Sequence, residues 1–265
     1  MNILSTIAEF KRTEVAARKE LYPVALLEKS RFFETTPVSM TRYLRRPDKS
    51  GIIAEFKRKS PSKGMINAFV SIDQVSIGYM QAGASALSVL TDKEFFGGTN
   101  EDLTRARELN YCPILRKDFI IDPYQVIEAK SIGADAVLLI AAILDQKQMM
   151  ELAKLALNLG LETIMEVHSH EELDKHNEFI SIIGVNNRNL ADFSVSLDVS
   201  LHFSKLLGKD TLAISESGIR EPGDILFLRQ AGYQGFLVGE QFMATSDPAA
   251  ACHLFISKLK YEHDL

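Results

Sequence analysis

The sequence predicts an α/β fold, specifically a (β/α)8 TIM barrel with an N-terminal helical extension. From residue 50 onward, short apolar runs alternate with longer stretches of helical periodicity. There are eight such runs, the number that closes a parallel barrel. No glycine-rich nucleotide-binding motif follows any of them, which disfavours the competing architecture, an open doubly wound sheet.

The first part of the chain, residues 1–48, forms the predicted extension. Met1–Glu20 reads as an amphipathic helix, and Ser39–Leu44, preceded by Pro37, as a second short segment. The apolar residues of the first helix recur at roughly helical spacing: Ile3, Ile7, Phe10 and Val15. No linker or low-complexity segment divides the rest, so we expect residues 1–265 to form a single domain.

The predicted strands are short and rich in aliphatic residues. They are Ile52–Phe56, Ala86–Leu90, Pro113–Leu115, Ala136–Ala141, Thr163–Val167, Ile180–Val185, Leu212–Ile214 and Gly235–Val238. Segments such as Asp145–Leu159 and Pro222–Ala231 separate them and have helical periodicity. Several of these helices end at a glycine, the residue expected just past a helix terminus: Gly83, Gly133, Gly160 and Gly232.

Composition excludes several classes of protein. The net charge of −5 argues against a nucleic-acid-binding protein, despite the local run Lys57-Arg58-Lys59. No apolar run reaches the length of a membrane span, since the most apolar stretch, Ala134–Leu144, contains Asp135. The two cysteines, Cys112 and Cys252, form no metal or redox motif and read as packed thiols. We therefore expect a cytoplasmic protein that interacts with neither membrane nor nucleic acid.

The first predicted strand changes from apolar to charged along its length. Ile53, Glu55 and Lys57 share one face, because strand side chains alternate. A carboxylate and an ammonium on a core-facing side are costly to bury unless they pair or do chemistry. The run ends at Ser60-Pro61. It indicates either a strand that delivers charged groups into a site or a solvated basic turn after an edge strand.

Ionisable and amide residues follow the C-terminal ends of the predicted strands, where such barrels carry their active sites. The N-terminal ends begin instead with Gly, Ala, Pro or Ser, and packing does not readily explain this asymmetry. The main residues concerned are Glu55, Lys57, Asp92, Arg116, Lys117, Asp118, Glu166, His168, Asn186, Asn187, Arg188, Glu216 and Glu240.

Two glycine-containing turns, Ser217-Gly218 and Gly239-Glu240, follow the last two predicted strands. Barrels that handle phosphate esters commonly bind the phosphate on backbone N–H groups at these positions. Either turn alone could be an ordinary strand-to-helix connection, but together they favour a phosphorylated small-molecule substrate.

Lys57 and Lys117 stand at different strand ends with carboxylates opposite, which suggests acid–base chemistry. Burial can lower the pKa of a lysine enough for proton exchange near neutrality. A lysine could instead form a Schiff base, or merely form a salt bridge to Glu55 or Glu216. The nearby His168 and His170 lack a metal-binding motif, so we expect them in a solvated turn and helix start, with no metal site.

The motifs at the strand ends resemble the indole-3-glycerol phosphate synthase family, and the resemblance runs over nearly the whole chain. The matching stretches are Glu55-Phe56-Lys57-Arg58 with Ser60-Pro61-Ser62 and Gly64, Leu115-Arg116-Lys117-Asp118-Phe119, Met165-Glu166-Val167-His168, Gly184-Val185-Asn186-Asn187-Arg188-Asn189-Leu190 and Ser215-Glu216-Ser217-Gly218-Ile219. The motifs are specific because they occur jointly and in order. That family has a (β/α)8 barrel with an extra N-terminal helical segment.

The resemblance implies a substrate and a reaction. The substrate would be 1-(2-carboxyphenylamino)-1-deoxyribulose 5-phosphate, and the indole ring would close with loss of CO2 and water. The attack of the ring carbon on the ketone needs an acid to protonate the developing alkoxide. The later loss of hydroxyl needs an acid at oxygen and a base for the ring proton. No metal or organic cofactor is implied.

The resemblance also implies catalytic residues. By position these are Lys117, Glu166, Lys57, Glu55, Asn186 and Glu216. Lys117 would be the general acid for ring closure and Glu166 a base in the later steps. Lys57 would neutralise substrate charge and share the acid role. Glu55 and Glu216 would hold the lysines and the sugar hydroxyls, and Asn186 would contact polar groups of the substrate.

Substrate binding is implied for a second set of residues. They are Ser60, Phe95, Phe96, Phe119, Arg188, Leu190, Ser217, Gly218, Gly239 and Glu240. Phe119, with Phe95 or Phe96, would wall the pocket for the aromatic ring. Ser217 to Gly218 and Gly239 to Glu240 would form the phosphate cradle, while Ser60 would organise the first loop.

Three other functions remain open at this point. A phosphoribosylanthranilate isomerase would use a Cys–Asp pair, but Cys112 precedes its strand and so lies at the wrong end. A Schiff-base aldolase would use one of the lysines covalently. A barrel without activity could bind only a phosphate ligand or a partner. We expect a monomer, with a weak homodimer as the alternative.

Overall fold

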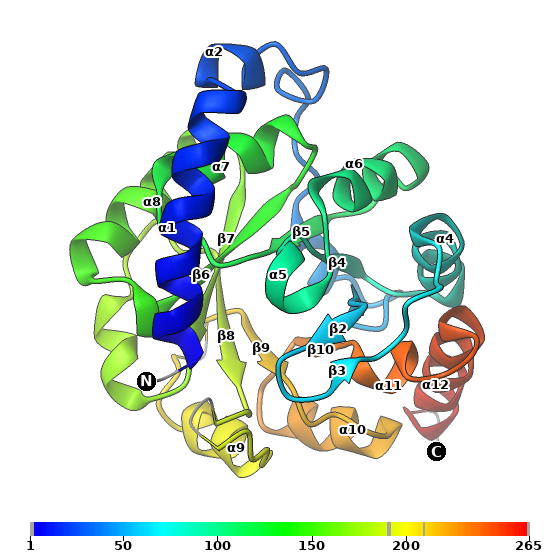
Figure 1. Ribbon diagram of the computed structural model, residues 1–265. Helices are drawn as coiled ribbons and strands as arrows, with labels where there is room; N and C mark the ends of the chain where they lie inside the picture. The colour runs from blue at the N-terminus through cyan, green and yellow to red at the C-terminus, as the bar shows by residue number, and fades with distance from the viewer. Residues whose placement is uncertain (1–2, 190–191, 209, 264–265) are drawn as a thin grey trace.

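Eight strands form one closed parallel barrel in the computed structural model, which describes residues 3–189, 192–208 and 210–263 (Figure 1). The strands are β1 (Ile52–Phe56), β4 (Ala86–Leu90), β5 (Ile114–Lys117), β6 (Ala136–Ile140), β7 (Glu162–Val167), β8 (Ile182–Asn186), β9 (Ala213–Glu216) and β10 (Gly235–Val238). Their order around the barrel follows the chain, with β10 pairing to β1 in parallel. The predicted fold class is confirmed, and each predicted strand is present within a few residues of its expected bounds.

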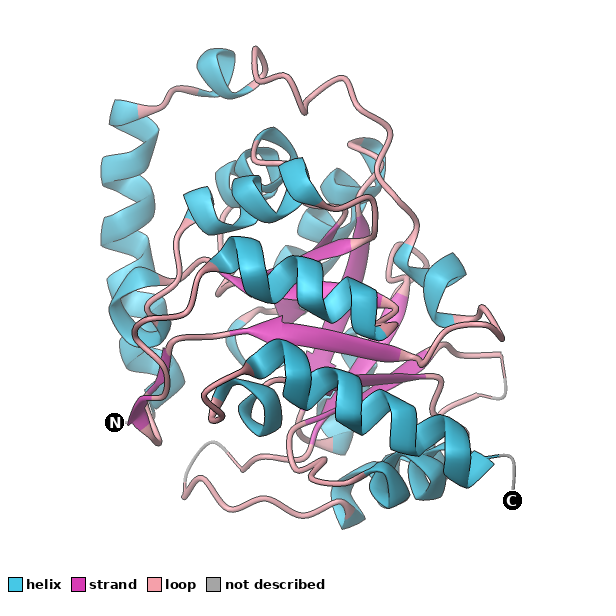
Figure 2. Cartoon of the chain, turned by 90° about the vertical axis from the view of Figure 1, so that its right-hand side faces the viewer, coloured by secondary structure: helices cyan, strands magenta, loops and turns pink. Residues whose placement is uncertain are grey.

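Helices surround the barrel on its outside (Figure 2). They are α4 (Ile72–Ala82), α5 (Lys93–Phe96), α6 (Asn100–Leu109), α7 (Pro123–Ser131), α8 (Gln146–Asn158), α9 (Asp198–Ser204), α10 (Pro222–Gln230), α11 (Glu240–Met243) and α12 (Pro248–His263), with the 3-10 helices η1 (Ala141–Ile143) and η2 (His170–Lys175). Between β7 and β8 the described chain forms η2 in place of an α-helix. The expected glycines after helices all have positive φ: Gly83, Gly133, Gly160 and Gly232. None of the helices in the described ranges combines the length and apolarity that a membrane crossing requires.

The N-terminal extension contains three helices, α1 (Ile3–Leu21), α2 (Val24–Leu27) and α3 (Met40–Leu44). Figures 1 and 2 show α1 lying across one end of the barrel. The two predicted segments are confirmed as α1 and α3, and the hydroxyl of Ser39 caps α3 by accepting the backbone N–H of Arg42. The one-turn helix α2 has no periodic signal and was not expected.

A buried ion-pair cluster attaches α1 to the barrel. Lys11 is 1% exposed, and its Nζ lies 2.9 Å from both Asp92 Oδ2 and Asp118 Oδ1. Those carboxylates follow the C-terminal ends of β4 and β5. Asp118 also accepts a 2.6 Å hydrogen bond from the hydroxyl of Thr91. The middle of α1 is therefore fixed beside the end of the barrel that carries the polar residues.

We expect Lys11→Met to destabilise the protein by about 3–5 kcal/mol, because breaking a buried ion pair leaves uncompensated carboxylates in the interior. Urea unfolding of wild type and variant measures the difference. The matched control is Arg12→Met, since the guanidinium of Arg12 is 65% exposed and, among the described residues, pairs only with exposed Glu9. Equal losses in the two variants would contradict a special contribution from Lys11.

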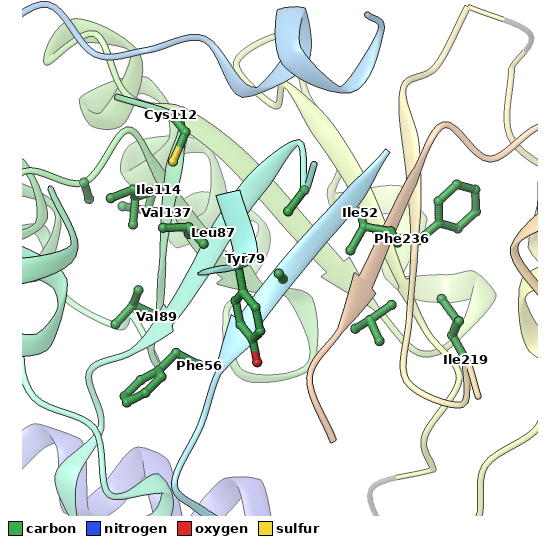
Figure 3. Close-up of a cluster of buried hydrophobic side chains, with 14 of the residues drawn as sticks. Ile52, Phe56, Tyr79, Leu87, Val89, Cys112, Ile114, Val137, Ile219 and Phe236 are labelled. Carbon is green, nitrogen blue, oxygen red and sulfur yellow. The ribbon is translucent and has the colours of Figure 1, made fainter. Parts of the chain in front are cut away.

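The core has two layers, one outside the strands and one inside the barrel. Figure 3 shows part of the outer layer, where Ile52 and Phe56 of β1 share a cluster with Leu87 and Val89 of β4 and Tyr79 of α4. The inner layer is filled by the side chains of alternate residues. They include Ile53, Ala86, Leu115, Ala136, Leu138, Ile164, Ile182, Ile214 and Leu237. The adjacent residues Ile52 and Ile53 thus belong to different layers, as strand alternation requires.

Candidate active site

Four charged side chains form the last inward-facing layer at the C-terminal end of the barrel. Glu55, Lys117, Glu166 and Glu216 come from alternate strands, namely β1, β5, β7 and β9. Each stands two residues after an apolar residue of the inner core: Ile53, Leu115, Ile164 and Ile214. Since alternate strands contribute the residues of one layer in such barrels, the strand register brings these four groups together.

Lys117 lies between carboxylates. Its Nζ is 3.2 Å from Glu166 Oε2 and 3.5 Å from Glu216 Oε2. The second lysine, Lys57, follows β1 and forms a 2.6 Å ion pair with Glu55 Oε1. The lysines therefore make the ion pairs that a purely structural role would require. They also line a cavity, where such pairs are available to a substrate.

The other oxygen of Glu166 faces two further residues. The Nδ2 of Asn186, on β8, donates to Glu166 Oε1 over 3.2 Å, and His168 Nε2 lies 3.3 Å from the same oxygen. Only 13% of the His168 side chain is exposed. The expectation of a solvated turn at His168 is therefore wrong, because the imidazole is enclosed by acidic residues. Within the described residues, no group of three or more His, Cys, Asp or Glu side chains is placed to hold a metal ion.

The buried charges move the pKa values of the layer apart. Burial lowers the pKa of Lys117. The nearby carboxylates of Glu166, Glu216 and Glu55 raise this pKa by more than burial lowers it, so the net shift is upward. The net shift of the Lys117 pKa is thus opposite to the lowering that burial alone can cause, and Lys117 carries a proton at neutral pH. Burial raises the pKa of Glu166, but Lys117 and His168 outweigh it and lower that pKa. Glu166 is consequently ionised and able to accept a proton.

Glu216 behaves differently from Glu166. Burial, opposed by Lys117 and reinforced by Glu166 and Glu55, raises the pKa of Glu216 to about 8. Like charges in close proximity cannot all ionise easily, so one carboxyl of the group keeps its proton near neutral pH. The site thus contains an ionised carboxylate, a protonated carboxyl group and a lysine ammonium in mutual contact.

We expect Glu216→Gln to change the pH dependence of stability. Because the pKa of Glu216 is higher in the folded protein than in the unfolded chain, protonation of Glu216 stabilises the folded state. This stabilisation is fully present below pH 4.5, the usual pKa of the group, and is lost as the pH rises through about 8. The neutral glutamine lacks this loss. Urea unfolding at pH 5 and pH 8.5 should therefore show the variant gaining stability relative to wild type at the higher pH. A difference that stays constant with pH would contradict the raised pKa.

Two glycines make room for the carboxylates. A Cβ at Gly184, on β8, would lie 2.4 Å from Glu216 Oε1. A Cβ at Gly239 would lie 2.6 Å from Glu55 Oε1 and 2.9 Å from Glu55 Cβ. Contacts this short do not occur between real atoms, so any side chain at either position would displace a carboxylate of the layer. Gly239, predicted for phosphate binding, leaves the space that the side chain of Glu55 occupies.

An apolar cavity of about 130 Å³ opens above the charged layer. Its walls include Leu90, Ile140 and Phe119 from the barrel side, and the rings of Phe96 and Phe119 lie 5.8 Å apart between centroids. The N-terminal helix α1 supplies a further apolar wall, composed of Ile3, Leu4 and Ile7. Sequence reasoning placed Ile3 and Ile7 on one helix face but gave no signal that this face borders the site.

The segment after β1 forms a small antiparallel hairpin, β2 (Lys59–Ser60) with β3 (Gly64–Met65). It was not predicted, and it places Ser60, Pro61 and Ser62 at the cavity. Arg58 is held away from the cavity by two hydrogen bonds to Asp102, of 2.6 and 2.8 Å. Within the basic run Lys57-Arg58-Lys59, Lys57 therefore lies at the site, whereas Arg58 forms a structural ion pair.

A second cavity of about 180 Å³ adjoins the first and shares Lys57, Arg188 and Glu240 with it. Two turns line it: Ser217-Gly218, both with positive φ, and Gly239-Glu240. Arg220 also lines this cavity and was not predicted. Backbone turns with arginine and lysine beside them provide an environment suited to an anion.

The structure brings together nearly all of the predicted site residues. The two adjoining cavities are lined by Glu55, Lys57, Ser60, Phe96, Lys117, Phe119, Glu166, Asn186, Arg188, Glu216, Ser217, Gly218, Gly239 and Glu240. Phe95 is placed elsewhere, because its ring packs edge-on against Phe10 at 5.6 Å, so Phe96 is the partner of Phe119. Leu190 lies outside the described residues.

Comparison with known proteins relates the whole chain to one family. The family model for indole-3-glycerol phosphate synthase matches residues 4–255. An indole-3-glycerol phosphate synthase of Bacteroides thetaiotaomicron is 47% identical over 98% of this chain and 99% of its own length. Another, of Laribacter hongkongensis, is 42% identical over 96% of this chain and 99% of its own length.

Solved structures share the fold at low sequence identity. Tryptophan synthase subunit alpha from Legionella pneumophila superposes with a TM-score of 0.61 at 14% identity, covering 85% of this chain and 97% of that one. A tryptophan synthase chain from Pyrococcus furiosus gives 0.59 at 14% identity, covering 80% of this chain and 99% of that one. At such identities the likeness concerns the barrel alone. The family match and the close relatives agree over nearly the full length, and the chain therefore belongs to the indole-3-glycerol phosphate synthase family.

Proposed function

We propose that the chain catalyses the conversion of 1-(2-carboxyphenylamino)-1-deoxyribulose 5-phosphate to indole-3-glycerol phosphate, with release of CO2 and water. It is thus a carbon–carbon lyase of tryptophan biosynthesis. The observation that carries the proposal is Lys117, a buried ammonium in contact with Glu166 and Glu216 at the floor of an apolar cavity. Family membership supplies the identity of the substrate.

The parts of the site match the parts of this substrate. The apolar walls, with Phe96 and Phe119, suit the aromatic ring, and the adjoining turns at Gly218 and Gly239 suit the phosphate. Lys57 lies at both cavities and would neutralise negative charge on the substrate. The charged layer at the floor of the first cavity then faces the carbon atoms that react.

Ring closure requires an acid at the ketone. As the carboxyl-bearing ring carbon attacks, Lys117 gives its proton to the developing alkoxide. The carboxylate then leaves as CO2, and its bonding electron pair returns to the ring. In the last step Lys57 protonates the hydroxyl, which leaves as water, while Glu166 accepts the proton from the neighbouring ring carbon, and the double bond that forms between these carbons completes the indole ring. The ionised state of Glu166 and the protonated state of Lys117 are those that these roles need.

Incubation of the purified protein with the carboxyphenylamino substrate tests the proposal, because the product has indole fluorescence that the substrate lacks. Appearance of that fluorescence at a catalytic rate is the expected result. Borohydride trapping of a lysine adduct would indicate a Schiff-base aldolase instead. Binding without turnover would indicate a barrel that has kept only ligand recognition. A cytoplasmic location and a monomeric state stay predictions.

A further inference from the structure

His168 is a buried imidazole that the proposed mechanism does not use. It follows β7 directly, and its Nε2 lies 3.3 Å from Glu166 Oε1 while its Nδ1 lies 3.8 Å from Glu172 Oε2. Both ring nitrogens are buried and form no hydrogen bond with any described residue. A buried polar group without a partner is costly, so an imidazole placed between two carboxylates calls for an explanation.

The position of His168 is fixed by η2. Glu172 accepts the backbone N–H of His168 over 2.7 Å, which closes the turn between β7 and η2. Lys175, also on η2, donates to the carbonyl oxygens of Ala141 and Leu144 at 2.6 and 2.8 Å and so attaches η2 to η1. These contacts fix the backbone that carries the imidazole beside Glu166.

The groups that face His168 are acidic. They are Glu166 on β7, Glu172 on η2 and, at longer range, Glu216 on β9. The cation Lys117, on β5, lies against the opposite oxygen of Glu166. Burial lowers the pKa of His168, but the carboxylates of Glu172 and Glu166 favour the protonated imidazole and outweigh burial, so that this pKa is raised.

We propose that His168, held in place by Glu172, is a positioning residue that fixes the carboxylate of Glu166 and keeps it in the ionised form needed for a base. The inference rests on the proposed function. Oε1 of Glu166 faces His168 and Asn186, whereas Glu216 has no such pair and its Oε1 lacks a hydrogen-bond partner among the described residues. Glu166 and Glu216 compete for one proton. His168 favours the state in which Glu216 holds it, and Glu166 stays free to accept a proton from the substrate.

The first test compares the pH dependence of kcat/KM for wild type, His168→Leu and His168→Gln. Leucine removes both the charge and the contact, so the acidic limb should move upward by about one pH unit. Turnover below neutral pH should fall about tenfold and recover at high pH, with KM unchanged. Glutamine is neutral but has an amide that can reach toward Glu166, so the pH profile of His168→Gln should lie between those of the other two proteins. His170→Gln is the control, because His170 is exposed at the start of η2, two residues after His168.

The second test needs no substrate. The imidazole of His168 is titrated by NMR in the free wild-type protein and in Glu166→Gln, where the loss of a facing carboxylate should lower its pKa. An unchanged titration would overturn the inference, as would an active His168→Leu variant with the pH profile of wild type. A loss of turnover equal at every pH would show a merely structural role. If wild type makes no indole product, the proposed function fails, and the titration still decides whether His168 and Glu166 are coupled.

Discussion

Lys117→Ala is expected to lower turnover about 10²–10⁴-fold while the barrel stays folded, which is the contribution of a positioned acid. The ammonium lies within 3.5 Å of Glu166 and Glu216, and no other lysine contacts either carboxylate in the described part of the chain. Its loss also removes the main cation that lowers the pKa of Glu166 and one that acts beside Lys57 to lower the pKa of Glu55. Both carboxyl groups would then protonate more readily, so the variant loses the acid and weakens the base.

The indole fluorescence assay measures this turnover, and circular dichroism verifies the fold. Lys147→Ala on α8 is the matched control, because this lysine is 80% exposed and its one ion pair within the described ranges is with exposed Glu151. Full activity of Lys117→Ala would remove Lys117 from the mechanism. An equal loss in both variants would indicate a preparation effect rather than chemistry.

Glu166→Gln is expected to bind substrate as wild type does and to turn it over about 10²–10⁴-fold more slowly. Glutamine preserves the shape of the side chain and an oxygen that can accept from Asn186 or Lys117. It cannot accept the ring proton, so the loss should appear in kcat rather than in KM.

Equilibrium binding of substrate to the variant, measured beside kcat, separates the two effects. Glu171→Gln serves as the control, since Glu171 is exposed on η2. A variant that turns over normally would require a different base. Weakened binding with normal kcat would assign Glu166 to substrate recognition.

The strands and the charged layer could be predicted because both depend on local pattern and on one topological rule. Aliphatic runs define strands, and the C-terminal ends of parallel strands meet, so Glu55, Lys117, Glu166 and Glu216 were expected at one end. The prediction for β5 stopped at Leu115, because Arg116 and Lys117 look unlike strand residues until their burial is known. Periodicity detects apolar residues and misses charged residues that a site retains.

Other features depend on contacts that are distant in sequence. The cavity wall from Ile3, Leu4 and Ile7 exists because α1 docks on the barrel through Lys11, and a helical pattern does not say where a helix docks. The direction of the Lys117 pKa shift depends on how many carboxylates surround it, which burial alone does not give. His168 looked solvated because its acidic neighbours lie on η2 and β7, on both sides of a turn.

The four charged groups of the site stand on strands rather than on loops, so insertions in the loops and shifts of the strands should affect the protein differently. Their spacing is fixed by backbone pairing such as Asn186 with Glu216 and Leu90 with Lys117, and the connecting loops do not set it. Insertions in the loops should alter which molecule enters while the proton-transfer groups keep their arrangement. A one-residue slip of a single strand would instead turn its charged residue outward and bring an outer-layer side chain into the barrel. Chemistry and selectivity are thus carried by separable parts of the chain, and variation in the loops can explore new substrates without rebuilding the reacting centre.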